Sequence, residues 1–166
     1  MKFFIYTVVF LAFLVMQVLF STYFRISGIA PNFLLVFVIS NSLIRDQKHG
    51  FFWGLTTGLV LDIMIGRALG FNALLFMYIG LLIGLLGDRI YRDSLLPPMF
   101  FVILSTLFYN LATYFVFFYR TSGLFTWDFF SSQIGVEMMY NAIIVLIVHK
   151  FIVYIDVFVT EKTNIY

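Results

Sequence analysis

The sequence predicts an all-α integral membrane protein, folded as a compact bundle of six transmembrane helices with both termini in the cytoplasm. Composition is the first reason, because 63% of the 166 residues are hydrophobic and 11% are charged, whereas soluble domains are roughly 25% charged. A mean hydropathy of +1.04 points the same way. Second, six apolar segments follow one another and no polar domain separates them. Third, lysine and arginine concentrate at alternate ends of those segments.

The six segments form a single transmembrane domain over residues 1–166. They cover residues 3–24, 31–44, 50–65, 70–87, 98–118 and 134–157. Pro31 stands at the start of the second segment and Pro97 and Pro98 at the start of the fifth, where a missing N–H costs least. The second and third segments are short: at 1.5 Å per residue, sixteen residues span about 24 Å, less than a bilayer core of roughly 30 Å. Short, closely connected helices predict a compact bundle.

Basic residues set the orientation of the bundle. If the N-terminus is cytoplasmic, the inner ends carry Lys2, Arg45, Lys48, Arg89, Arg92, Lys150 and Lys162, and the outer ends carry Arg25, Arg67 and Arg120. This asymmetry favours cytoplasmic N- and C-termini and therefore an even number of crossings. The basic inner loops are suited to face anionic lipid or a cytoplasmic partner.

Aromatic residues mark the expected membrane interfaces. The connection from Tyr119 to about Gln133 is expected as an aromatic-rich outer loop on the membrane surface. Trp53 and Trp127 are expected to anchor the bundle at its interfaces.

A stripe of small residues runs through the third segment. Gly50, Gly54, Gly58, Asp62, Gly66 and Gly70 recur at every fourth position, which places them along one side of a helix. One interpretation is internal packing, with Gly80, Gly84 and Gly87 of the fourth segment as the opposing face. The other is a docking face for another protein. Small residues at this spacing commonly pack helices within one bundle, which favours the first interpretation.

Ionisable and amide side chains inside the apolar segments predict a polar cluster in the outer leaflet. Asp62 lies twelve residues beyond Gly50, about 18 Å across the membrane. An aspartate in the centre of a membrane helix costs roughly 2.5–3.5 kcal/mol, so it needs a partner or a task. The expected members of the cluster are Asp62, Arg67, Asn72, Asn110 and Glu137. Either Asp62 pairs with Arg67 or caps a neighbouring helix and so locks the bundle, or the cluster forms a ligand cavity or a contact with a partner's helix.

The sequence offers little support for catalysis, cofactors or nucleic acid. It contains no Gly-x-Ser-x-Gly elbow, no His-Glu-x-x-His helix and no phosphate-binding Gly-x-x-x-x-Gly-Lys loop. It has no cysteine, and a net charge of +2 is too small to indicate nucleic-acid binding. We therefore expect no enzyme activity, cofactor or metal site. A homodimer is compatible with the sequence.

The segment from Pro31 to Gly70 resembles the rod shape-determining membrane protein MreD family. The resemblance rests on Pro31-Asn32 at a helix start, followed by Gly54, Gly58, Asp62 and Gly66 at four-residue steps and then Leu69-Gly70. Outside residues 31–70 the agreement is one of hydropathy.

The resemblance implies a non-enzymatic scaffold of the bacterial elongation complex, in the inner membrane. It implies that the chain binds MreC, a protein with a single transmembrane helix. Through MreC it would link MreB filaments to peptidoglycan synthesis by RodA and a penicillin-binding transpeptidase.

An alternative function comes from another class of protein. The MreD family is similar in fold to the substrate-binding subunits of energy-coupling-factor vitamin transporters. In that case Asp62, Asn110 and Glu137 would line a vitamin pocket, and the glycine stripe would dock the transporter module. Fold resemblance does not decide between the two functions.

Overall fold

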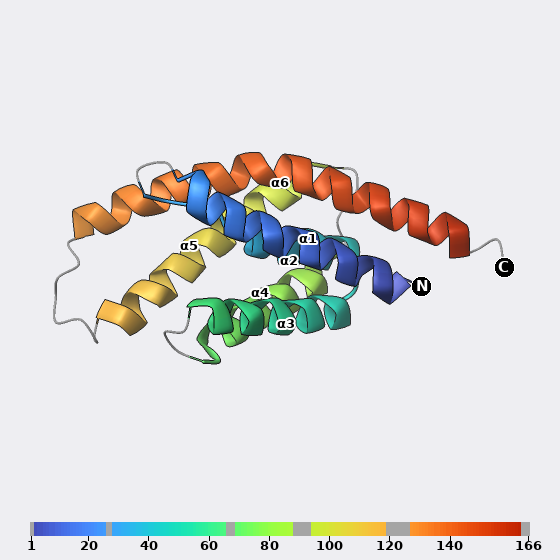
Figure 1. Cartoon of the computed structure of the whole chain (residues 1–166), viewed down its shortest axis with the longest axis horizontal. Helices are drawn as coiled ribbons and strands as arrows, with labels where there is room; N and C mark the ends of the chain where they lie inside the picture. The colour runs from blue at the N-terminus through green and yellow to red at the C-terminus, as the bar shows by residue number, and fades with distance from the viewer. Residues whose placement is uncertain (1, 26–27, 66–68, 88–93, 119–126, 164–166) are drawn as a thin grey trace.

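The computed structural model describes residues 2–25, 28–65, 69–87, 94–118 and 127–163, and this part of the chain is built from six α-helices (Figure 1). The helices are α1 (Lys2–Tyr23), α2 (Phe33–Ile44), α3 (Gln47–Ile65), α4 (Phe71–Gly87), α5 (Leu96–Phe118) and α6 (Trp127–Thr163). For the described residues, the prediction of an all-helical fold with six helices is confirmed.

Three of these helices are long and apolar enough to cross a membrane within Phe4–Tyr23, Leu96–Val116 and Gln133–Thr160. Two more, α2 and α4, are apolar but shorter. The chain is therefore a multi-pass membrane protein. Crossing by α2, α3 and α4 stays a prediction.

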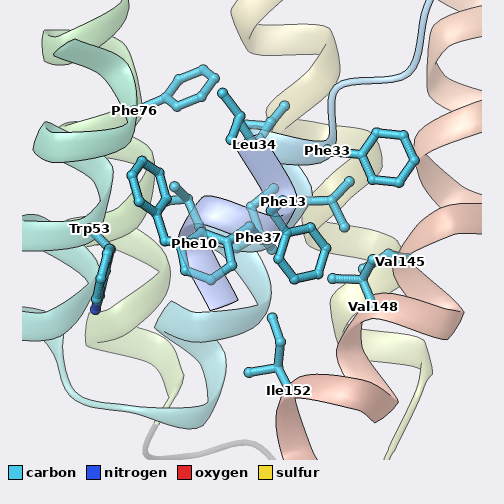
Figure 2. Close-up of a cluster of buried hydrophobic side chains, with 14 of the residues drawn as sticks. Phe10, Phe13, Phe33, Leu34, Phe37, Trp53, Phe76, Val145, Val148 and Ile152 are labelled. Atoms are coloured by element: carbon cyan, nitrogen blue, oxygen red, sulfur yellow. The ribbon is translucent and has the colours of Figure 1, made fainter. Parts of the chain in front are cut away.

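The second helix is the centre of the bundle. All twelve residues of α2 are buried, and α2 contacts each of the other five helices. Around it Phe10, Phe13 and Trp53 pack against Phe37, with ring centroids 5.4–5.9 Å apart (Figure 2). Lipid chains are as apolar as these side chains, so close van der Waals packing, rather than exclusion of water, stabilises this core.

Hydrogen bonds at the two ends of α2 fix the directions of its neighbours. At its start the backbone N–H of Asn32 donates to Asn141 of α6, and just past its end Arg45 bonds to Asp156 of α6. The two helices therefore run in the same direction. Tyr6 of α1 also bonds to Asp156, so α1 runs the opposite way to α2. We call the two ends of the bundle the Asp62 end and the Asp156 end.

The start of α1 and the end of α6 lie on the same side of the molecule (Figure 1). This arrangement is the one that cytoplasmic N- and C-termini require. Which side of the membrane they occupy stays a prediction.

Two sequence-based expectations are wrong. Trp53 does not anchor a membrane interface, because it is 4% exposed and its ring fills the space beside Phe10 and Phe37. The expected outer loop does not reach Gln133, because α6 already begins at Trp127. Residues 127–133 include polar side chains, which end the apolar run in the sequence. They contain no proline or glycine, so they can still continue a helix. Residues 119–126 of that expected loop lie outside the described residues, and the anchoring role of Trp127 stays a prediction.

Candidate functional site

Asp62, near the end of α3, caps the start of α4. Its Oδ1 accepts hydrogen bonds from the backbone N–H of Asn72 at 3.0 Å and from Nδ2 of the same residue at 2.8 Å. Its Oδ2 accepts from the backbone N–H groups of Gly70 at 2.9 Å and Ala73 at 3.0 Å. The residue is 1% exposed. The carboxylate thus satisfies N–H groups that have no partner within α4, and its charge faces the positive end of the helix dipole.

Gly70 makes this cap possible through its backbone conformation. Its φ is +94°, in the left-handed region that residues with a Cβ rarely adopt. A Cβ there would meet nothing within 4 Å, so the requirement is conformational and not steric. The glycine allows the chain to turn so tightly that its own N–H points at Asp62.

The polar cluster continues through α5 to α6. The Tyr109 hydroxyl donates to Oδ1 of Asn72 at 2.8 Å, and the neighbouring Asn110 donates from Nδ2 to the Glu137 carboxylate at 3.0 Å. The structure therefore brings Asp62 and Asn72 together as one hydrogen-bonded pair, and Asn110 and Glu137 as another. Adjacent residues of α5 connect the two pairs.

Asn141 adds α2 to this end of the bundle. Its Oδ1 accepts from the backbone N–H of Asn32 at 2.8 Å, and its Nδ2 donates to Oγ1 of Thr106 at 3.0 Å. The side chain of Asn32 accepts from the N–H of Leu35 and so caps α2. Neither Asn141 nor Thr106 was predicted from the sequence. Asn141 carried a usable signal, since it stands one helical turn after Glu137, on the same side of α6.

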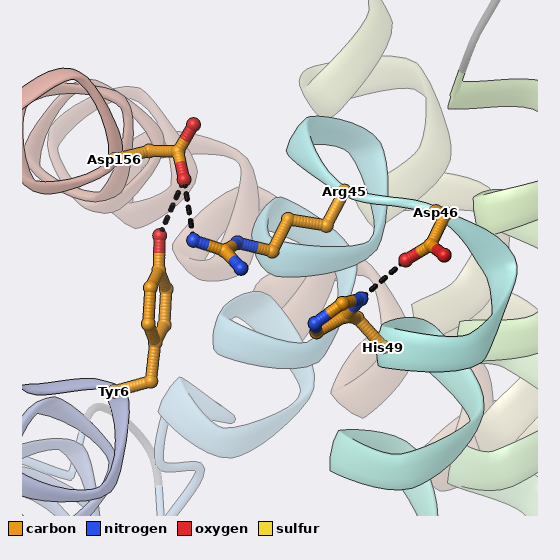
Figure 3. A network of polar contacts seen from close by, with 5 residues as sticks. All are labelled: Tyr6, Arg45, Asp46, His49 and Asp156. Carbon is orange, nitrogen blue, oxygen red and sulfur yellow. Dashed lines mark hydrogen bonds and ion pairs between the residues drawn. The ribbon is translucent and has the colours of Figure 1, made fainter. Parts of the chain in front are cut away.

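A second polar network closes the Asp156 end (Figure 3). Oδ1 of Asp156 accepts from the Tyr6 hydroxyl at 2.8 Å and from Nη2 of Arg45 at 2.7 Å. The Arg45 guanidinium also lies 4.2 Å from the centre of the Tyr6 ring, a cation–π contact. The network joins α1 and α6 to the residue that follows α2. The sequence did not reveal it, because the three residues are separated by up to 150 positions.

Beside this network, Asp46 in the turn before α3 contacts Nδ1 of His49 in the first turn of α3 (Figure 3). The hydrogen bond with His49 lowers the pKa of the Asp46 carboxyl below its usual range. Both side chains are about half exposed, so the pair adds little stability. The contact nevertheless means that the Asp46 carboxylate already has a partner, His49.

Three glycines of the stripe, Gly50, Gly54 and Gly58, are covered by α4 within the same chain. A Cβ on Gly50 would lie 2.8 Å from the carbonyl carbon of Gly80, and one on Gly58 would lie 2.6 Å from the backbone nitrogen of Ala73. On the opposing helix, a Cβ on Gly84 would lie 2.7 Å from Cα of Gln47. These distances are too short for any real side-chain carbon. Gly54 faces the backbone of Phe76 and Met77, and Gly87 faces carbonyl oxygens of Ser42 and Leu43. The close approach of the two backbones therefore accounts for these glycines without a partner.

Two of the predicted site residues, Gly66 and Arg67, lie outside the described residues. Pro31 directly precedes the Asn32 cap and is buried. Its carbonyl accepts from the side chain of Gln17 on α1, which provides a further link between α1 and the start of α2.

The geometry of these networks is suited to holding helices together. Among the described residues no group of three or more His, Cys, Asp or Glu side chains could hold a metal ion. Asp62 and Asp156 accept hydrogen bonds from neighbouring helices and turns, and Glu137 accepts one from α5. In membrane proteins such bonds contribute about 0.6 kcal/mol each to stability on average. Their effect therefore depends on how many there are and on which helices they join.

Fold and site together define a multi-pass helical membrane protein whose buried polar groups cap and join its helices. Comparison with protein families matches residues 1–155 to MreD, the rod shape-determining protein. The chain therefore belongs to the MreD family, and the family resemblance predicted from the sequence is confirmed. No curated protein and no solved structure matches the chain.

Family membership implies a role in determining rod cell shape and is consistent with a location in the cytoplasmic membrane. The family is not known to be enzymatic.

Proposed function

We propose that this chain is a non-enzymatic scaffold of the bacterial elongation complex, in the inner membrane. It binds MreC and thereby links MreB filaments to RodA and a penicillin-binding transpeptidase. The observation that carries the proposal is family membership over residues 1–155.

Two features of the structure support a scaffold. The first is that the buried carboxylates Asp62 and Asp156 serve contacts between helices and turns, which suits a rigid bundle. The second is that almost all of the described chain is helix, so a partner would meet mainly helix faces and short turns. The outward faces of α1 and α6 are apolar and accessible, with Phe4 71% exposed and Ile147 71% exposed.

The glycine stripe is a poor candidate for the MreC contact. Gly50, Gly54 and Gly58 are covered by α4, so a partner helix would have to displace α4 to reach them. We therefore place the contact on an outward face of the bundle.

Affinity purification from the native membrane tests the proposal. The tagged chain is extracted in a mild detergent, and proteins and small molecules that accompany it are identified by mass spectrometry. A tagged multi-pass protein of another family, expressed at the same level, serves as the control. Specific recovery of MreC, together with rounding of cells that lack the chain, is the expected result.

Two outcomes would contradict the scaffold. Recovery of a transporter ATPase module or a bound vitamin would support the energy-coupling-factor alternative. Normal rod shape in cells that lack the chain would remove the connection to the elongation complex altogether.

A further inference from the structure

A groove of about 290 Å³ lies at the Asp156 end, between the start of α3 and the later half of α4. Its lining is divided by chemistry. Gln47 and Lys48 supply an amide and an ammonium group, and Phe51 and Leu81 supply apolar surface. Phe51 lies about one helical turn further along α3 than Gln47, so the polar part of the groove is closer to the end of the helix.

The groove lies beside a close approach of the two helices. Gly50 and Gly80 bring the backbones together, and Phe51 and Leu81, which line the groove, are the residues that follow them. Phe51 is 38% exposed, so its ring is accessible to a ligand in the groove.

The positive charge of the groove is not balanced within the described part of the chain. Lys48 is exposed and makes no hydrogen bond or ion pair with any side chain that the structure describes. The two acids of this end whose side chains the structure describes are engaged elsewhere, Asp46 by His49 and Asp156 by Arg45. Within the described part of the chain, the Lys48 ammonium group is therefore available to an anion.

We propose that this groove binds an anionic phospholipid of the surrounding bilayer. Its phosphate would lie at Lys48 and Gln47, and the first part of an acyl chain would lie along Phe51 and Leu81. The volume is at the lower limit for ligand pockets, which suits a headgroup and the beginning of a chain rather than a whole lipid. Basic pockets between membrane helices bind such headgroups. The site is independent of whether the chain binds MreC.

Native mass spectrometry of the full chain tests the site. The chain is reconstituted in bilayers of equal parts phosphatidylethanolamine and phosphatidylglycerol, and the phosphatidylglycerol that stays bound is counted after release. K48Q is expected to lower this retention by about fivefold, the effect of one basic group near an anionic surface. K48R keeps the charge and should restore it.

Two further variants separate the groove from general surface charge. K150Q removes another exposed lysine, on α6 and outside the groove, and should leave retention unchanged. L81W fills the apolar part of the groove while Lys48 remains, and should lower retention. The thermal midpoint of each variant shows that it is folded.

Equal retention by K48Q and the wild type would overturn the proposal, and so would an equal loss in K48Q and K150Q. Equal affinity of the site for inorganic phosphate and for the phospholipid would overturn the lipid assignment, because the acyl chain would then contribute nothing.

Discussion

Replacing Asp62 with asparagine tests whether the buried carboxylate holds α3 and α4 together. The two carboxylate oxygens each accept two hydrogen bonds, one pair from Asn72 and one from Gly70 and Ala73. Asparagine retains one oxygen and presents an NH₂ group in place of the other. Whichever way the amide is turned, two of the four bonds are lost and their donors face another donor.

The structure bounds the size of the effect. Each lost bond costs about 0.6 kcal/mol if it behaves as an average interhelical bond in a membrane. Each costs about 1.5–3 kcal/mol if it behaves as a hydrogen bond to a charged group. Because Asp62 is 1% exposed and its partners are mostly backbone N–H groups, we expect a value between these limits, about 2–4 kcal/mol for the pair.

Unfolding of the detergent-purified chain by sodium dodecyl sulfate, followed by circular dichroism, measures this loss. Amide hydrogen exchange at Asn72 and Ala73 should rise in D62N, because these N–H groups lose their acceptor. D46N is the matched control, since it makes the same chemical change at a half-exposed site outside the helices. If D62N stays within about 0.5 kcal/mol of the wild type, as a surface substitution would, and exchange is unchanged, Asp62 does not cap α4.

Three further substitutions probe the packing and the other polar groups. G58A should destabilise the chain by about 1–3 kcal/mol in the same unfolding assay, because its Cβ would press on backbone; G135A, whose Cβ meets nothing within 4 Å, should not, and equal effects would argue against the close helix contact. Y6F removes the hydroxyl bonded to Asp156 and should cost about 1 kcal/mol, whereas an unchanged midpoint would show that this bond is not formed. N41L should be neutral or stabilising, because Asn41 is fully buried and neither polar atom of its side chain has a hydrogen-bond partner among the described residues; a clear loss of stability would contradict this expectation.

The candidate site was only partly predictable from the sequence. Asp62, Asn72, Asn110 and Glu137 stood out because polar residues are costly in apolar helices, and their level along each helix follows from counting residues. Which residues these side chains would bond to could not be predicted from the sequence. The sequence left open whether Asp62 meets an arginine or the start of another helix, a choice that depends on how the turn before α4 folds back.

The polar network at the Asp156 end could not be predicted from the sequence either. Tyr6 and Arg45 are unremarkable in the sequence, since one looks like part of an apolar run and the other like a basic residue of an inner loop. Only the packing of α1 and α6 around α2 makes them share one carboxylate oxygen.

Membrane class, helix number and the glycine stripe were all present in the sequence alone, because each depends on residues close to one another along the chain. Solvent preference follows from composition, and the side of a helix follows from its repeat. The central place of α2 and the pairing of Asn32 with Asn141 came only from the tertiary structure. Five of the six described helices contain long or short apolar segments that could face either lipid or protein. Hydrophobicity therefore does not decide which helix is enclosed, and that choice is left to shape and to the few hydrogen bonds between distant segments.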